Sequence, residues 1–593
     1  MKVIKNIIYM LKYLWKIDKW YMPISFVSIL FAIINPFIDI YLYKKLIDNI
    51  TEKISFLSIF ITLGLMFGLG IIASLLQKLF FDIIFLKRGT EITTKMQLIV
   101  AEKALSYDVE CYESSEFYNM YVKAATEAEG RVIWVWNTCL SIVSYTVALA
   151  TIFVIVVGID IFVLIFSIAS VILGFIFQFV TSKNSFKLEN GKTEVQREQA
   201  YFSRNMYLPS FIYDIKMTKI KEIFFDKLIN SKNKIITLIK TYGYKVIFFD
   251  MIKEILFSII QFGTMIYLSV MIFLSHITIG AFTSMLNASG RFSDNLKLLI
   301  NTIPDLYKHS LFIDNFKKFM EYKPKIDKED GIILNNFNNS IIMNNVSFKY
   351  PNTDELVIKN ICLEINKGEK IAIVGENGAG KTTLIKLILR FYDPTHGEVK
   401  IDNINYKNIN VSSLRKKFSI LFQDYSLYAT SIAENVIMQK NTKSNNITIA
   451  DALTKAGVIE KVNESKYGID TIATKEFNDD GASFSGGERQ KIALARIYYN
   501  EKEIVVLDEA NASLDPISEY KMNQNILNLT ENKTTIFISH RLTNVKRADK
   551  IFYMENGMII EQGSHNELIK LNGKYAYMYN LQSSNFNEDK DVF

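Results

Sequence analysis

The sequence predicts a bundle of membrane helices in the first half of the chain and an α/β domain in the second half. The chain has 593 residues, which is enough for several domains. Its mean hydropathy of +0.14 and its 42 phenylalanines are high for a protein surrounded only by water. Long apolar segments occur up to residue 303, and short apolar runs alternate with helical patterns from residue 341 onward. We therefore expect two kinds of domain in one chain.

Residues 1–19 predict an amphipathic helix. Apolar side chains recur there at helical spacing, with lysines between them. Because this segment runs directly into a long apolar stretch, we interpret it as a helix that lies on the membrane surface. A helix packed on a protein core would show the same pattern.

The membrane domain is expected over residues 20–320. A span needs about 20 mostly apolar residues. Six segments meet this requirement, at about 20–43, 56–85, 133–157, 159–181, 246–274 and 278–303. Two intervening segments, at about 86–132 and 182–245, are long, helical in pattern and rich in lysine and arginine. The positive-inside tendency places them in the cytosol together with the N-terminus, so we expect a multi-pass protein of the plasma membrane whose helices extend beyond the lipid bilayer.

Each cytosolic excursion contains a short segment that interrupts the helical pattern. Residues 107–118 are aromatic and acidic, and residues 207–216 contain Pro209, which should end a helix near Leu208. We hypothesise that both are transverse helices that contact the second domain, because exposed aromatic side chains at a loop tip usually have a partner. Solvated turns are the alternative.

Charged residues inside the predicted spans have two interpretations. Arg291 and Asp294 lie three residues apart in the sixth span. A substrate contact is open, but a structural ion pair or a position already outside the lipid is favoured. Asp39 is expected near the outer headgroups. The net charge of +7 is small and dispersed, so no nucleic-acid partner is expected. The three cysteines show no metal-binding spacing.

The strongest motif is a glycine loop between an apolar run and a helical run. In this context, backbone N–H groups and the N-terminus of the helix bind phosphate. The lysine would reach the outer phosphates, and the first threonine would offer its hydroxyl to Mg²⁺. The nine residues of the loop are Gly375, Glu376, Asn377, Gly378, Ala379, Gly380, Lys381, Thr382 and Thr383.

The loop lies within a predicted ATPase domain of residues 341–582, which follows a charged linker of residues 321–340 and precedes a disordered tail of residues 583–593. Asp508 and Glu509 follow an apolar strand, where α/β sheets bind their ligands. Asp508 suits Mg²⁺, and Glu509 is placed to polarise the attacking water.

Three more side chains near predicted strand ends belong to this site. Gln423 can supply its amide to Mg²⁺ or to water, and His540 can donate to the γ-phosphate. Tyr350 follows a predicted strand ahead of the glycine loop and could stack on adenine.

A second anion site is predicted at the start of another helix. Ser485, Gly486, Gly487 and Glu488 combine a hydroxyl with exposed backbone N–H groups. Because one chain then has two phosphate-binding elements, two ATPase domains should face each other, each completing the nucleotide site of the other. Asp515 would lie at the shared face.

The order of these motifs resembles that of the ATP-binding-cassette superfamily, and six spans before one cassette resemble its exporter branch, as a half-transporter. The resemblance covers nearly the whole chain. It implies ATP and Mg²⁺ as cofactors, Tyr350 as the adenine-stacking aromatic residue, and Glu509 as the catalytic carboxylate, acting with His540, Gln423 and Lys381. Two departures concern Phe484, where the family usually has leucine, and Glu488, where it usually has glutamine.

The expected function is therefore ATP hydrolysis coupled to the export of a small molecule, lipid or peptide. The active form would be a dimer, and a homodimer is favoured over a heterodimer with a related half-transporter because every catalytic position is filled. An importer, an ATP-gated channel and a sensor are the alternatives. The sequence does not specify the substrate.

Overall fold

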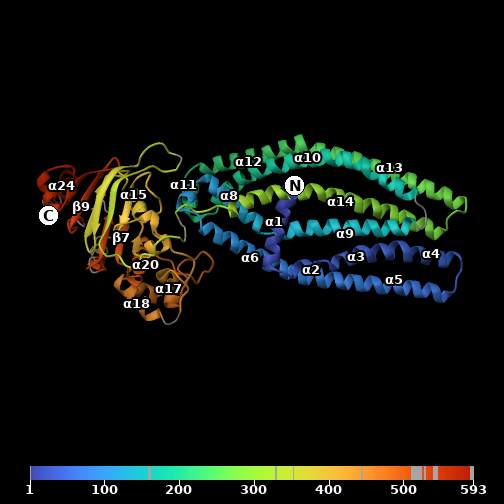
Figure 1. The fold of residues 1–593 in the computed structure, drawn as a ribbon, viewed down its shortest axis with the longest axis horizontal. Coiled ribbons are helices and arrows are strands. Elements are labelled where there is room, and N and C mark those ends of the chain that lie inside the picture. Colours follow the sequence, from blue (N-terminus) through green and yellow to red (C-terminus); the bar gives the residue numbers. More distant parts are fainter. Residues whose placement is uncertain are drawn as a thin grey trace. The chain divides into compact units, whose positions relative to one another are not determined.

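The computed structural model describes residues 2–157, 162–326, 330–351, 353–442, 445–508, 524–526, 529–538 and 545–587. The chain forms two compact units (Figure 1). The membrane unit comprises Met1–Leu105 and Asn119–Glu321, and the ATPase unit comprises Ser106–Tyr118 and Tyr322–Phe593. The segment Ser106–Tyr118 thus belongs to the second unit, although in sequence it interrupts the first.

The region up to Met320 is helical. Its elements are α1 (Lys2–Ile17), α2 (Tyr21–Ser25), α3 (Val27–Pro36), η1 (Phe37–Leu42), α4 (Tyr43–Thr51), α5 (Phe56–Gln77), η2 (Lys78–Phe85), α6 (Leu86–Leu105), α7 (Val109–Tyr112), α8 (Ser115–Ala128), α9 (Arg131–Val157), α10 (Phe162–Asn205), α11 (Pro209–Met217), α12 (Ile220–Leu238), η3 (Ile239–Gly243), α13 (Tyr244–Phe273) and α14 (Ile279–Met320). Helix α14 packs along α9, and α10 packs along α12 and α13 (Figure 1).

Four of the described helical segments are long and apolar enough to cross a membrane, at Tyr21–Thr51, Phe56–Leu105, Arg131–Val157 and Ile220–Phe273. Residues 162–181 of the predicted fourth span form part of α10, and its first three residues, like the turn at residues 158–160, lie outside the described residues. The predicted sixth span falls within α14, where Arg291, Asp294 and Lys297 lower the hydropathy. Six spans therefore remain a prediction.

The position of Asp39 near the outer headgroups stays a prediction. The helix continues through η1 and α4 to Thr51, which lies about 18 Å further along a helix. Asp39 forms an ion pair with Arg291 of α14. Arg291 thus has its partner on another helix, whereas Asp294 is exposed. Of the two favoured interpretations, the structural ion pair is confirmed for Arg291, with Asp39 as its partner.

Helix α1 packs on protein along one face. Asn6, Ile7, Met10 and Leu14 are buried, and the Asn6 amide donates to the Ser310 carbonyl oxygen of α14 at 3.1 Å. Trp15 is half-exposed. The amphipathic pattern therefore reflects packing within the membrane unit on one side and leaves apolar side chains exposed on the other.

The ATPase unit contains two sheets. Their strands are β1 (Ser340–Phe348), β2 (Ile358–Asn366), β3 (Lys370–Gly375), β4 (His396–Ile401), β5 (Ile404–Asn405), β6 (Phe418–Leu421), β7 (Ile504–Asp508), β8 (Thr534–Ile538), β9 (Lys550–Glu555) and β10 (Met558–Gly563). The smaller sheet is antiparallel, with the order β2-β1-β4-β5, and the larger has the order β10-β9-β3-β8-β7-β6. Strands β9, β3, β8, β7 and β6 are parallel to one another.

Helices cover these sheets and form a second, helical part of the unit. They are α15 (Lys381–Ile388), α16 (Val411–Arg415), α17 (Ile432–Ile437), α18 (Asn446–Lys455), α19 (Ile459–Asn463), α20 (Gly486–Tyr499), α23 (His565–Leu571) and α24 (Lys574–Asn587). Helix α15 shares one hydrophobic core with both sheets. Helices α17, α18 and α20 share another core with β6 and β7 (Figure 1).

The predicted disordered tail from residue 583 is corrected at its start. Helix α24 continues to Asn587, because residues 583–587 contain neither glycine nor proline to end it. Residues 588–593 lie outside the described residues.

Candidate nucleotide-binding site

The glycine loop has the backbone of a phosphate-binding loop. Strand β3 ends at Gly375 and α15 begins at Lys381. Gly375 has a φ of +148°, and a Cβ there would lie 2.1 Å from the Met554 carbonyl oxygen of β9. Gly380 has a φ of +99°, a left-handed conformation that favours glycine. The tight turn therefore depends on glycine at both ends of the loop.

Side chains at the start of α15 point in different directions. The Lys381 ammonium is buried and donates to the carbonyl oxygens of Gly375 at 2.9 Å and Glu376 at 2.8 Å. Thr382 is exposed, whereas Thr383 is buried. The loop thus holds the lysine against its own backbone while Thr382 stays accessible, and their roles toward phosphate and Mg²⁺ stay predictions.

Tyr350, the candidate adenine-stacking residue, contacts the same helix. Its hydroxyl lies 2.9 Å from Thr383 Oγ1. Its ring packs edge-on against Phe348 and Tyr392, with centroid distances of 5.2 and 5.4 Å. The structure therefore places the predicted aromatic residue beside the predicted phosphate loop.

Asp508 and Gln423 lie at the same edge of the larger sheet as the glycine loop. Strands β3, β7 and β6 are parallel and end at Gly375, Asp508 and Leu421, respectively. Asp508 is buried and Gln423 is exposed. Glu509, Asp515 and His540 lie outside the described residues.

The second predicted anion site is the N-terminus of α20. Ser485 caps this helix: its hydroxyl accepts from the backbone N–H of Glu488 at 3.3 Å, and the Glu488 carboxylate accepts from the backbone N–H of Ser485 at 2.8 Å. This reciprocal arrangement is a capping box. The two departures from the family pattern now have a physical reading. Glu488 caps the helix, and the buried Phe484 fills the helical core as a leucine would.

A cavity of about 660 Å³ lies between the segment that begins at Gln423 and the start of α20. It is lined by Gln423 and the residues that follow it, by Phe484 and Gly486, and by residues around Ala473. Tyr425 donates from its hydroxyl to the Gly486 carbonyl oxygen at 2.8 Å. The Gln423 segment is thus tied to the start of α20.

The donors present fit Mg²⁺ bound together with phosphates. Thr382 offers a hydroxyl, Gln423 an amide oxygen and Asp508 a carboxylate, and oxygen ligands are those that Mg²⁺ prefers. Among the described residues there is no group of three or more His, Cys, Asp or Glu side chains that could hold a metal. Nucleotide-bound Mg²⁺ needs only one or two carboxylates, so the two observations agree.

The sequence reasoning missed the contacts of Ser106–Tyr118 with particular residues. Asp108 is fully buried and accepts from the Tyr322 hydroxyl at 2.7 Å and from the backbone N–H groups of Lys325 and Ile326 at 2.7 and 2.9 Å. Tyr107 stacks on Tyr322, with a centroid distance of 3.9 Å. The Glu113 carboxylate also pairs with the Lys386 ammonium, so the hypothesis that this segment contacts the ATPase domain is confirmed.

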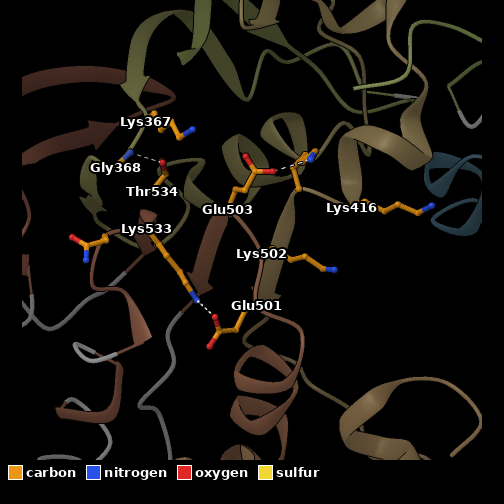
Figure 2. Close-up of a pocket in the computed structure, with 10 residues that line it drawn as sticks. Lys367, Gly368, Lys416, Glu501, Lys502, Glu503, Lys533 and Thr534 are labelled. Carbon is orange, nitrogen blue, oxygen red and sulfur yellow. Dashed lines mark hydrogen bonds and ion pairs between the residues drawn. The ribbon is translucent and has the colours of Figure 1, made fainter. Parts of the chain in front are cut away.

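Another hollow of the ATPase unit lies at the opposite ends of the strands. It is lined by Lys367 and Lys416 and by ion pairs of Lys417 with Glu503 and of Lys533 with Glu501 (Figure 2). Strands β6, β7 and β8 begin there, whereas the glycine loop follows the end of β3. This basic hollow is therefore separate from the candidate nucleotide site.

The fold and site define a P-loop ATPase domain joined to a helical membrane region. Residues 358–512 match the family model of the ABC transporter. The chain is 28% identical over 494 residues to the nisin transport ATP-binding protein NisT of Lactococcus lactis subsp. lactis, covering 82% of this chain and 81% of that protein. It is 26% identical over 552 residues to the subtilin transport ATP-binding protein SpaT of Bacillus subtilis, covering 92% and 89%.

The chain is also similar to a lipid flippase and to a solved structure of an exporter. The chain is 32% identical over 330 residues to the ATP-dependent lipid A-core flippase of Coxiella burnetii (strain RSA 493 / Nine Mile phase I), covering 55% of each. The fold resembles that of a bacterial Atm1-family ABC exporter with ATP bound, with a TM-score of 0.77, 19% identity and coverage of 95% of this chain and 99% of that one. The chain carries the ATPase domain of an ABC transporter, which couples ATP hydrolysis to transport, and its fold is that of an ABC exporter with membrane and ATPase domains fused.

Proposed function

We propose that the protein exports a peptide from the cytosol across the plasma membrane, as a dimer of two copies with ATP sites formed between them. The observation that carries this proposal is the presence, in one ATPase unit, of a complete glycine loop at β3 and a second helix N-terminus at α20 suited to an anion. One nucleotide bound to one chain needs only one such phosphate-binding element. Two copies facing each other would use both elements of each chain.

A peptide is favoured over a lipid because of the length of the similar regions. The alignments with the nisin and subtilin transport proteins extend over 494 and 552 residues. Both are longer than the whole ATPase unit, which consists of Ser106–Tyr118 and Tyr322–Phe593. They therefore reach well into the membrane unit, where a substrate would bind. The alignment with the lipid A-core flippase extends over only 330 residues.

Polar and charged side chains of α14 are candidates for contact with this cargo. Asn287, Arg291 and Asp294 lie four and three residues apart, so they share one face of the helix. At about 18 Å from the start of α14, Arg291 is deep enough to lie within the lipid core. Charges at that depth usually face a partner or a water-filled path. Arg291 forms an ion pair with Asp39. We propose that Asp294 faces the water-filled path that the cargo would take.

The catalytic assignments follow the family motifs. Glu509 would position the attacking water, and Lys381 and His540 would stabilise charge on the γ-phosphate. Thr382, Gln423 and Asp508 would hold Mg²⁺, which supplies further charge stabilisation. Ser485, Gly487 and Asp515 of the second copy would complete the site. A homodimer is favoured over a heterodimer because every catalytic position is filled.

The substitution Glu509→Gln in inside-out vesicles tests this function. We expect nucleotide to stay trapped on the protein and ATP-driven uptake of peptide to stop, because the water is no longer polarised. An ATP-gated channel would still let peptide pass, and an importer would move it in the opposite direction. Stimulation of ATP hydrolysis by a panel of peptides, lipids and drugs would test the cargo class separately.

A further inference from the structure

The basic hollow of the ATPase unit carries positive charge that the chain does not neutralise. Five lysines and two glutamates are among the ten residues that line it. The Lys417 ammonium pairs with Glu503 at 2.8 Å, and that of Lys533 pairs with Glu501 at 3.4 Å (Figure 2). The other three lysines have no ion pair among the described residues, and we call them the three unpaired lysines: Lys367, Lys416 and Lys502.

The Lys417–Glu503 pair is part of the folded framework. The Glu503 carboxylate accepts from the Phe337 backbone N–H at 2.8 Å as well as from Lys417. Lys417 also donates to the Asn335 carbonyl oxygen. Burial would raise the pKa of Glu503, but its hydrogen bonds outweigh burial and lower it. The pair is therefore ionised and held by the chain, so the three unpaired lysines are the cations that remain for a ligand.

The backbone fixes where the three unpaired lysines start. Lys367 lies on the turn between β2 and β3, where the next N–H, that of Gly368, donates to Thr534 Oγ1 at 2.7 Å (Figure 2). Lys416 directly follows α16, and Lys502 comes two residues before β7. Three connections of the chain thus bring one lysine each to the same hollow. A concave surface with one sign of charge concentrates ions of the opposite sign.

The residue types in the lining indicate which anion fits. Lysine binds phosphate as a point charge, whereas the planar fork of arginine matches a carboxylate with two bonds. None of the ten lining residues is arginine, so phosphoryl groups are favoured over carboxylates. None is aromatic, so no ring there can stack on a base. The cavity volume of about 480 Å³ lies within the range of small-molecule sites, about 300–1,000 Å³.

We propose that the basic hollow is a binding site for a compact soluble anion with two or more phosphoryl groups. The site is distinct from the candidate nucleotide site. Strand β7 begins beside the hollow at Ile504 and carries Asp508 at its other end, about 13 Å further along the strand. Binding there needs neither a second copy of the chain nor a cargo, so the inference goes beyond the proposed function.

Tripolyphosphate is the probe that tests this site. The full chain is placed in nanodiscs of phosphatidylcholine, whose headgroups carry no net charge. A non-hydrolysable ATP analogue and Mg²⁺ saturate the nucleotide sites, so that the probe cannot bind there. Equilibrium dialysis of radiolabelled tripolyphosphate then gives its Kd. We expect saturable binding to the unmodified chain.

The test variant replaces the three unpaired lysines together, with Lys367→Gln, Lys416→Gln and Lys502→Gln. Its Kd should be about tenfold higher, because each exposed ion pair contributes a factor of about two to five. The same three positions changed to arginine keep the charge and should retain binding. The matched control removes the same charge from exposed lysines outside the hollow and should leave the Kd unchanged; it combines Lys407→Gln, Lys440→Gln and Lys570→Gln.

An unchanged Kd in the test variant would overturn the proposal, as would an equal loss in the control variant or no saturable binding to the unmodified chain. Citrate that binds as tightly as tripolyphosphate would overturn the assignment to phosphoryl groups. Binding of the ATP analogue, measured in each variant, verifies that the ATPase unit is folded. Peptide uptake into vesicles is a separate measurement, so a chain that binds tripolyphosphate in the hollow but moves no peptide would contradict only the proposed function.

Discussion

Two short segments, Ser106–Tyr118 (the first tip) and α11 with Pro209–Met217 (the second tip), differ in how far their side chains are buried. Tyr107 in the first tip is 2% exposed and Phe117 is 5% exposed, both packed within the ATPase unit. The second tip belongs to the membrane unit, where Tyr213 is 77% and Met217 is 85% exposed. Both tips are aromatic, but only the first is buried within its own unit. The second has the surface expected of a docking element for another copy of the chain.

The stability of the first tip should depend strongly on one hydrogen-bond acceptor, the Asp108 carboxylate. Asp108→Ala would leave the N–H groups of Lys325 and of the buried Ile326 without their acceptor, which costs about 3 kcal/mol. We expect a clear fall in the Tm of the ATPase unit and rapid proteolysis within Ser106–Tyr118. Asp354→Ala, at a fully exposed side chain, is the control and should change neither. An unchanged Tm in Asp108→Ala would show that the tip does not depend on this carboxylate.

A substitution in the second tip should lower transport without changing the stability of the folded protein. Tyr213→Ser removes an exposed ring, so the free energy of unfolding should change by less than about 0.5 kcal/mol. ATP-driven peptide uptake should fall several-fold, because the ring would no longer dock on the partner. Tyr201→Ser, half-exposed in the same excursion but outside the tip, is the control. Normal peptide uptake in Tyr213→Ser would show that the exposed ring of the second tip has no role in transport.

The smallest expected effect is on the pH dependence of the rate at which maleimide labels the Cys111 thiol. Burial, the largest cause, raises the pKa of its thiol. A raised pKa leaves less thiolate at pH 8, so labelling should be slow there and should keep rising at pH values where an ordinary thiol has levelled off. Asp108→Ala should speed labelling at pH 8, because release of the segment lowers the pKa. A rate that levels off at the ordinary thiol pKa would show that the first tip is open.

Much of the nucleotide site could be predicted from the sequence because its residues follow strands or begin helices in fixed local patterns. The strand before Gly375, the glycines and Lys381 are contiguous, and Asp508 ends an apolar run. Parallel strands then bring their carboxyl ends to one edge, so residues far apart in sequence meet by a general rule.

The contacts of the first tip could not be predicted in the same way. Asp108 and Glu113 are ordinary acidic residues in an aromatic segment, and their partners Tyr322 and Lys386 come only after the whole of the membrane unit in sequence. No periodicity connects them.

The central claim is that each ATP site is shared between two copies of the chain, and a mixing experiment tests it most directly. Ser485→Arg and Lys381→Ala are each expected to abolish ATP hydrolysis when present in both copies. In a mixed dimer, the intact glycine loop of one copy meets the intact Ser485 of the other. Random pairing should then restore hydrolysis to roughly a quarter of the unmodified rate. A mixture no more active than its two inactive components would contradict a shared site.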